Sequence, residues 1–482
     1  MLSLAGILLS LGLLIALAYR GISVIVLGPL AALLAAAFAT GTPLLATYTQ
    51  QYMPALGQFI VAYFPLFLLG AIFGRLMDDS GFARAIADTI IRWIGPQQGI
   101  LATVLACAVL TFGGVSLFVV AFAIYPVASA LFRAGNIPKR LLPASIALGS
   151  FTFTMTALPG TPAIQNAIPM PYFGTTSFAA PGLGLMAALI MFGGGQLWLS
   201  LAARRAAKAG EGYSAENPMP AKTRFTTPEP TALRDKAHGG GYDLNELSPD
   251  KNRALVPFAL AITPILLVIA LNYLFSAHIL PGQDTSYLGE ARFGATTIDA
   301  VRGVWSIILS LSIAIGFILL TGRCIKAPSR SVVEGATAAV LPIFNTASLV
   351  GFGAVVASLP GFMMVQTALA EAGGGPLVSL AITTAVLAGL TGSASGGMTI
   401  ALEAVGAEYK ALADSAGIDP GVMHRITSLA TGSLDALPHN GAVITLLSIC
   451  GLGHRQAYGS IFMVAVAIPL LALIAALVVA SL

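Results

Sequence analysis

The long stretches without any ionisable side chain constrain this chain more than any other feature. No Asp, Glu, Lys, Arg or His occurs in residues 21–74, 93–132 or 141–203, and the last of these gaps is 63 residues long. One membrane-spanning helix needs about 20 apolar residues, so each gap is long enough for more than one crossing. Charged residues make up 9% of the chain, against about 25% in a soluble domain. The sequence therefore predicts an all-α, polytopic membrane protein.

The composition also excludes other classes of protein. The net charge of +4 comes from basic residues that mark cytoplasmic loops, so we expect no nucleic-acid partner. Cys107, Cys324 and Cys450 are an odd number without metal-ligand spacing, which argues against a disulfide framework or a zinc site. The chain has no H-E-x-x-H motif and no phosphate-binding loop. We therefore expect neither an enzyme nor an ATP-driven pump, and no cofactor.

The basic residues predict the orientation in the membrane. When basic loops are assigned to the cytoplasm, only Arg292, Arg302, Lys410 and Arg425 of the 24 Lys and Arg fall on the outer side. Both termini are then periplasmic, and the polar stretch 204–253 is a cytoplasmic linker. The predicted continuous spans are 2–19, 22–39, 55–75, 182–203, 254–276, 301–321, 338–359 and 457–481, and 141–170 and 421–450 are interrupted spans.

Two segments fit re-entrant hairpins better than full spans. Residues 96–132 begin and end near cytoplasmic charges and carry TFGGVS (111–116) at their middle. Each limb of about 16 residues would be about 24 Å long, short of the roughly 30 Å hydrocarbon core. Residues 376–407 carry TGSASGGMT (391–399) and are flanked by Glu371 and Glu408 on the outer side. The alternative is two short, tilted full spans at each place.

The two halves of the chain repeat one pattern. LLGAIFGRLMDDSGFARAIA (68–87) precedes the first hairpin motif and TALPGTPAIQN (156–166) follows it, whereas VGFGAVVASLPGFMMVQTALA (350–370) and DALPHNGAVIT (435–445) flank the second. The Ala-Leu-Pro proline follows the hairpin threonine by 48 residues in the first half (Thr111 to Pro159) and by 47 in the second (Thr391 to Pro438). The predicted orientation inverts one copy relative to the other, as in many secondary transporters. We therefore expect inverted repeats at 1–203 and 254–482, with about ten spans and two hairpins.

Four polar segments interrupt the helices at membrane depth: 111–116, 157–166, 391–399 and 435–442. Irregular backbone is tolerated there only when it is buried in protein or lines a polar cavity. The half-helix N-termini favour a carboxylate, which predicts an anion site. The alternative for each segment is a kink or close helix packing. The candidate substrate-binding residues are Gly114, Ser116, Gly160, Thr161, Asn166, Ser393, Ser395, Gly396, Asn440, Gly441 and Thr445.

Asp435 is the most informative ionisable residue because it lies inside a predicted span. Charged groups at that depth are costly and usually belong to ion or proton pathways. His439 follows four residues later and would share its helix face if the helix continued past Pro438. We expect Asp435 and His439 to couple transport to an ion, and the alternative is that Asp435 caps a half-helix. Glu403 is a weaker candidate that would reach the outer surface, and Asp78 and Asp79 beside Arg75 are expected to form a solvated ion-pair cluster.

Several motifs resemble the gluconate permease (GntP) family of the ion-transporter superfamily. The segment LLGAIFGRLMDDSGFARAIA resembles its third span, GSASGGMTIALEA and LPGTPAIQN resemble its polar motifs, and DALPHNGAVITLL is similar to its hydroxybutyrate-permease-like branch. The first polar motif departs from the gluconate transporters, which have a His-containing stretch there. The resemblance implies a proton symporter of small hydroxy- or keto-carboxylates in the bacterial inner membrane. It also implies a homodimer with elevator-type movement.

The leading hypothesis is a secondary active transporter that imports a small organic anion, such as gluconate or 3-hydroxybutyrate, together with protons. A sodium-coupled carboxylate symporter, with sodium near Ser395 and Asn440, is one alternative. An uncoupled anion facilitator or channel is another, because the same site would serve it.

Overall fold

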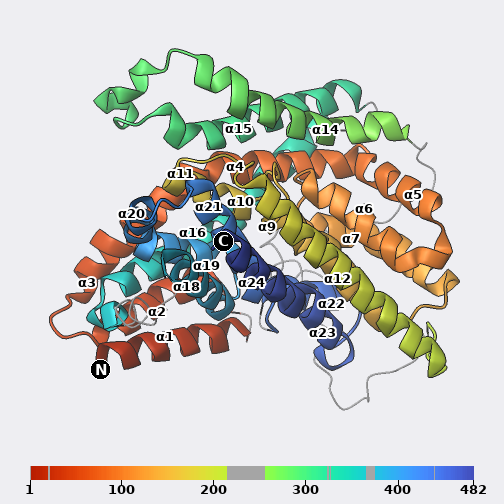
Figure 1. Ribbon diagram of the computed structural model, residues 1–482, viewed down its shortest axis with the longest axis horizontal. Helices are drawn as coiled ribbons and strands as arrows, with labels where there is room; N and C mark the ends of the chain where they lie inside the picture. Colours follow the sequence, from red (N-terminus) through yellow and green to blue (C-terminus); the bar gives the residue numbers. More distant parts are fainter. Residues whose placement is uncertain are drawn as a thin grey trace.

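The computed structural model describes residues 2–19, 22–213, 256–322, 325, 327–364, 375–438 and 440–481. These residues form helices and connecting turns, and none of them lies in a strand (Figure 1). The all-α class predicted from the charge-free gaps is therefore confirmed.

Among the described residues, six helices are long and apolar enough to cross a membrane, with lengths of 24 to 36 residues. Five shorter apolar helices, Leu2–Leu14, Val24–Ala37, Gly99–Phe112, Val119–Ala134 and Gly375–Gly389, accompany them. The polytopic membrane protein predicted from the sequence is thus confirmed. The six long helices are Leu44–Asp79, Pro181–Lys208, Phe258–Gly282, Ile298–Thr321, Pro328–Ser358 and His454–Ala480.

The first half of the chain ends with the long helix α12. Its elements are α1 (Leu2–Tyr19), α2 (Val24–Ala37), α3 (Leu44–Thr47), η1 (Tyr48–Tyr52), α4 (Met53–Asp79), α5 (Phe82–Ile94), η2 (Pro96–Gln98), α6 (Gly99–Phe112), α7 (Leu117–Ala134), η3 (Lys139–Leu141), α8 (Leu142–Ser150), α9 (Phe153–Thr156), α10 (Ile164–Ala167), α11 (Pro169–Phe173) and α12 (Pro181–Lys208).

The second half follows the same order of long helices, hairpin and broken helix. Its elements are α14 (Phe258–Leu274), η4 (Phe275–Ile279), η5 (Leu280–Gly282), η6 (Ser286–Gly289), η7 (Ala291–Phe293), α15 (Ile298–Thr321), α16 (Pro328–Ser358), α18 (Gly375–Thr391), α19 (Ala394–Ala401), η8 (Leu402–Gly406), α20 (Ala407–Ser415), α21 (Pro420–Leu434), α22 (Gly441–Ile449), α23 (His454–Phe462), η9 (Met463–Ala467) and α24 (Ile468–Ala480).

Helix packing recurs in matched pairs across the two halves. α1 packs on α2 as α14 packs on α15, and α2 contacts α16 as α15 contacts α4. The long helices α4 and α16 pack against each other between these two pairs (Figure 1). This approach is close, since a Cβ added at Gly335 of α16 would lie 2.8 Å from the Cα of Ile72 on α4. The matched contacts agree with a repeat, while its boundaries at 203 and 254 and its orientation in the membrane stay predictions.

The two predicted hairpins are present as pairs of packed helices. α6 and α7 are joined by residues 113–116, and α18 and α19 by residues 392–393. The first limbs have 14 and 17 residues, about 21 and 26 Å at roughly 1.5 Å per residue. Both are shorter than the roughly 30 Å hydrocarbon core. The second limb of the second pair is longer, since α19, η8 and α20 run on without a gap over residues 394–415, so the re-entrant course stays a prediction.

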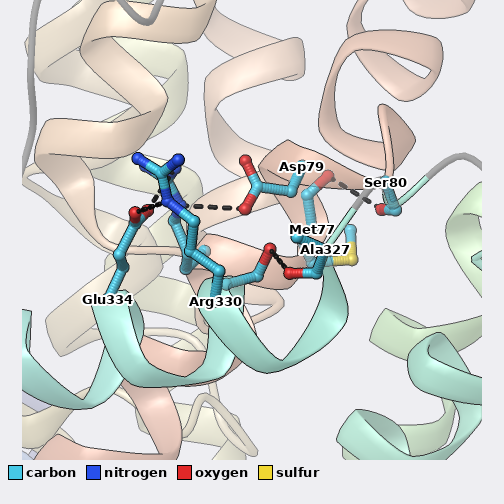
Figure 2. Close-up of polar contacts among 8 residues, drawn as sticks. Met77, Asp79, Ser80, Ala327, Arg330 and Glu334 are labelled. Carbon is cyan, nitrogen blue, oxygen red and sulfur yellow. Dashed lines mark hydrogen bonds and ion pairs between the residues drawn. The ribbon is translucent and has the colours of Figure 1, made fainter.

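The charged end of α4 differs from the solvated cluster predicted for it. Arg75 Nη2 lies 2.7 Å from Glu334 of α16, and Arg75 Nε donates to Asp79 at 2.9 Å. Figure 2 shows Asp79 of α4 near Arg330 and Glu334 of α16. Arg330 Nε in turn lies 2.6 Å from Glu334. Arg75 is only 9% exposed, so this is a half-buried network that joins the two central helices.

The linker also begins with ordered contacts rather than as a free chain. Arg140 donates to both carboxylate oxygens of Glu211, at 2.6 and 2.9 Å. Tyr213 contacts Ser129 through its hydroxyl at 2.7 Å and donates its backbone N–H to Asn136. The start of the linker is thus docked on the base of the first hairpin, and its remaining residues, 214–253, lie outside the described part of the chain.

Candidate functional site

The first interruption, residues 157–163 between α9 and α10, is hereafter the first break. Asn166, on the helix that follows, donates through Nδ2 to the carbonyls of Thr161 (3.0 Å) and Ser177 (2.9 Å). Asn272 of α14 donates to the Gly160 carbonyl (3.3 Å) and the Ser177 hydroxyl (2.8 Å). The break is therefore tied to the loop before α12 and to a helix of the other half.

Two adjacent side chains of α21 complete this polar cluster. Arg425 is 0% exposed and donates to the carbonyls of Thr156 (3.1 Å), Ser177 (3.3 Å) and Ala179 (3.1 and 2.9 Å) and to Asn166 Oδ1 (3.1 Å). His424 lies 3.1 Å from the same Asn166 oxygen through Nε2 and 2.6 Å from the Thr175 hydroxyl through Nδ1. All five N–H groups of the guanidinium are thus satisfied by neutral acceptors that flank the first break or lie in the loop before α12.

The second break, residues 435–440 between α21 and α22, is held mainly by its own asparagine. Asn440 donates through Nδ2 to the carbonyls of Gly392 (3.0 Å) and Asp435 (2.8 Å). Its Oδ1 accepts from the backbone N–H groups of Ala442 (2.6 Å) and Val443 (3.1 Å), which caps α22. Because Gly392 is the turn of the second hairpin, one side chain fastens that turn to the break.

Two residues of α23 contact the same segment. His454 Nε2 lies 2.9 Å from the Pro438 carbonyl, and the Tyr458 hydroxyl donates to the Ala436 carbonyl at 3.1 Å. Asp435 is half-buried, and no cationic side chain among the described residues lies within ion-pair distance of it. His439, its predicted partner, lies outside the described residues.

The hairpin turns lie against the breaks. A Cβ added at Gly114, whose φ is +94°, would lie 2.9 Å from Pro162 in the first break. Ser393 caps α19 by accepting from the Gly396 N–H at 3.2 Å, and Ser395 lies 3.5 Å from the Thr346 hydroxyl of α16. α10 contacts α19 and α22 contacts α7. The four polar segments therefore form two groups: residues 111–116 with the first break, and residues 391–399 with the second break.

The structure brings most of the predicted residues to these two groups. Gly114, Gly160, Thr161 and Asn166 lie at the first break, and Ser393, Ser395, Gly396, Asn440 and Gly441 at the second. Ser116 precedes α7, and Thr445 is buried within α22. Both asparagine amides already use two donors and two acceptor positions within the protein. A substrate would have to replace one of these bonds to contact Asn166 or Asn440.

Sequence reasoning missed several groups that the structure places at the site. The charge count places Arg425 on the outer side, and its only local signal is a cation inside a mainly uncharged segment. Gln165 is 8% exposed and its Oε1 has no hydrogen-bond partner in the described part of the chain, as is true of Asn345 Oδ1 and Thr111 Oγ1. Buried polar atoms without partners are uncommon in native proteins, so these are further candidate contacts.

Two comparisons with known proteins bear on identity. The chain is 45% identical over 462 residues to the uncharacterized transporter YxjC of Bacillus subtilis (strain 168), which covers 95% of this chain and 94% of that protein. Residues 11–166 match the family described as tripartite ATP-independent periplasmic (TRAP) transporter, DctM component. The chain belongs to the same transporter family as YxjC. It is therefore a multi-pass membrane transporter.

The DctM match corrects the resemblance to the gluconate permeases. The DctM match covers the segment 68–87 and the motif LPGTPAIQN, on which that resemblance partly rested. Short glycine-rich and proline-rich motifs at helix breaks meet the same backbone requirements in different transporter families, so they do not by themselves separate one family from another. The homodimer was implied by that resemblance alone, and the DctM description names a tripartite system instead.

Proposed function

We propose that this transporter imports a small organic anion, a hydroxy- or keto-carboxylate, by proton symport. The observation that supports this most is Asp435, a carboxyl group in the break of a membrane helix, five residues before the capped N-terminus of α22. Acidic groups at such depth belong mainly to ion and proton pathways.

The charge of Asp435 supplies a simple coupling mechanism. Two negative charges about 6 Å apart repel by about 3 kcal/mol at an effective dielectric constant of about 20. An ionised Asp435 therefore disfavours a carboxylate at the breaks, and protonation from the more acidic side removes the repulsion. By thermodynamic reciprocity the bound proton and the bound anion strengthen each other, so both are released together on the less acidic side.

The hydrogen bonds that Asn440 already makes favour a proton over sodium as the coupling ion. Sodium near Ser395 and Asn440 would need oxygen ligands, yet Asn440 Oδ1 already accepts two backbone N–H groups. A sodium ion would have to displace the cap of α22. Protonation of Asp435 requires no such change.

We infer an elevator-type movement from the packing. The two hairpins and the two broken helices contact one another, while α4 and α16 pair at the centre and join through Arg75 and Glu334. The hairpins and broken helices would then move as one body relative to this paired core and carry the site across the membrane.

Uptake into proteoliposomes tests the proposal. The purified protein is reconstituted and offered radiolabelled 3-hydroxybutyrate, gluconate, lactate and pyruvate, with or without an inward proton gradient. We expect uphill accumulation of at least one of these anions, abolished by a protonophore and unaffected by sodium. Uptake that requires sodium would replace the proton with sodium, equilibration without accumulation would indicate a facilitator, and no uptake of any anion would contradict the proposal.

A further inference from the structure

The buried guanidinium of Arg425 has hydrogen bonds but no counter-charge. Its partners are three backbone carbonyls and the amide oxygen of Asn166. In the part of the chain that the structure describes, no carboxylate lies within ion-pair distance of it. Arginine is not deprotonated in proteins, so a unit positive charge remains next to the first break.

Such a charge is costly unless an anion compensates it. Carbonyl dipoles satisfy the five N–H groups, but they carry no net charge, and burial of an unpaired ion is among the largest penalties in a protein interior. A transported carboxylate close to the first break would supply the missing negative charge. It would do so without displacing any of the five bonds, because the field of the guanidinium reaches beyond its contacts.

Gln165 gives independent support for a ligand at the same place. It immediately precedes Asn166, is 8% exposed and has an amide oxygen without a partner. Ser428, one turn after Arg425 on α21, donates to the Gln165 backbone carbonyl at 2.7 Å. The backbone of Gln165 is thus fixed by the helix that carries the charge, while its side-chain amide is left available.

We propose that Arg425 and Gln165 together select the anionic substrate. Arg425 supplies a fixed positive charge that acts on the anion through its field, without touching the substrate, so it is a positioning residue. Gln165 contacts the substrate directly through its amide. The ligand class is a small monocarboxylate with a neighbouring hydroxyl or carbonyl group, because one amide offers both a donor and an acceptor. This inference rests on the proposed function and deepens it.

The test compares KM values in the proteoliposome assay, with 3-hydroxybutyrate or the first anion of the panel that the wild type accumulates. We expect Arg425→Met to raise KM at least tenfold and Arg425→Lys, which keeps the charge but not the five bonds, to stay within threefold. Gln165→Leu is expected to raise KM about tenfold. Gln165→Glu, which introduces a negative charge, is expected to raise it still further.

Two matched controls separate these effects from general damage. Gln196→Leu removes another buried amide whose oxygen has no partner, on α12, and Arg302→Met removes a half-buried arginine of α15. Both are expected to change KM less than twofold. Folding is checked by size-exclusion profile and melting temperature.

Each of these measurements can contradict one part of the proposal. If Arg425→Lys loses as much as Arg425→Met, in KM or by failing to fold, then the role of Arg425 is packing and its part of the proposal is overturned. If Gln165→Glu has the KM of Gln165→Leu or of the wild type, no anion binds near Gln165. If the wild type shows no uptake, the proposed function is wrong. If the wild type is active and the variants have its KM, only the roles of Arg425 and Gln165 are wrong.

Discussion

The two breaks have similar sequences but are held in place by different hydrogen bonds. Residues 156–159 read Thr-Ala-Leu-Pro and residues 435–438 read Asp-Ala-Leu-Pro. In both, a side chain accepts from the N–H group two residues later, Thr161 from Ala163 and Asn440 from Ala442. The other half of the chain bonds the first break, through Asn272, and the residue before it, Thr156, through Arg425. The second break is held instead by Asn440, which bonds the turn after α18, and by α23.

This difference suggests a division of roles between the repeats. The first break has a buried positive charge and a large network of bonds, which suits a fixed surface for an anion. The second has an acid at the position that Thr156 occupies in the first, and its fewer contacts suit a group that must change its protonation state during transport. The predictions below test that division, from the largest expected effect to the smallest.

Removal of the acid is expected to have the largest effect. Asp435→Asn mimics the protonated carboxyl group, so we expect gradient-driven uptake to fall at least a hundredfold while exchange of labelled for unlabelled substrate continues. Uptake and counterflow in proteoliposomes measure the two activities. The folding of the variant is expected to stay near that of the wild type, as judged by melting temperature. Full gradient-driven uptake by this variant would remove Asp435 from the mechanism.

The two asparagines are expected to differ in their contribution to stability. Asn166→Ala removes four hydrogen bonds and leaves one N–H of the Arg425 guanidinium without an acceptor, at an expected cost of about 2–4 kcal/mol. Asn440→Ala removes a helix cap and the bond to Gly392, at a cost of about 1–2 kcal/mol.

Thermal unfolding of the two variants in one detergent compares them directly. We expect the lower melting temperature for Asn166→Ala. A lower value for Asn440→Ala would show that the second break, not the first, is the more firmly held.

Local sequence signals predicted the helices and breaks well, and the contacts between distant segments poorly. The charge-free gaps and the motifs at 111–116, 157–166, 391–399 and 435–442 identified the helices, the hairpins and both breaks, because apolar length and Gly/Pro content act within a few residues. The span ends were less accurate: α16 begins at Pro328, not at 338, because a helix continues beyond the apolar region. The contacts of Arg425 with residues 156–179 depend on how the halves pack, and no local pattern encodes that.

The close approach of α12 to the first break gives a smaller effect with a matched control. A Cβ at Gly184 would lie 2.4 Å from the Ala157 carbonyl and 3.1 Å from Arg425 Nε, whereas one at Gly182 would meet nothing within 4 Å. We expect Gly184→Ala to destabilise the protein by about 1–3 kcal/mol through overpacking and to raise KM.

Gly182→Ala is expected to change neither the stability nor the KM appreciably. Melting temperature and uptake of the two variants measure the difference. If the two variants have the same melting temperature and uptake, the first break adjusts easily to an added methyl group. That result would contradict the fixed surface inferred for it.

The smallest effect is expected outside the membrane, where the linker docks on the first hairpin. Hydrogen bonds from Arg140 hold the pKa of Glu211 below its ordinary value, so the pair stabilises the fold at pH above roughly 4.3, the unperturbed value for glutamate, and this contribution is lost as pH falls through the lowered pKa. Both side chains are more than a third exposed, so solvent screening limits the contribution to under about 1 kcal/mol.

The control for this pair is Glu211→Gln, which removes the titrating group and leaves the remaining carboxylates unchanged. Melting temperatures of both proteins from pH 7 to pH 3.5 isolate the contribution of Glu211, because the other acids titrate equally in both. We expect the wild type to lose slightly more stability than the variant over this range. If the two curves run parallel, the linker adds nothing to the first hairpin. The stronger support of the first half would then come from contacts such as those of Arg425 and Asn272 alone.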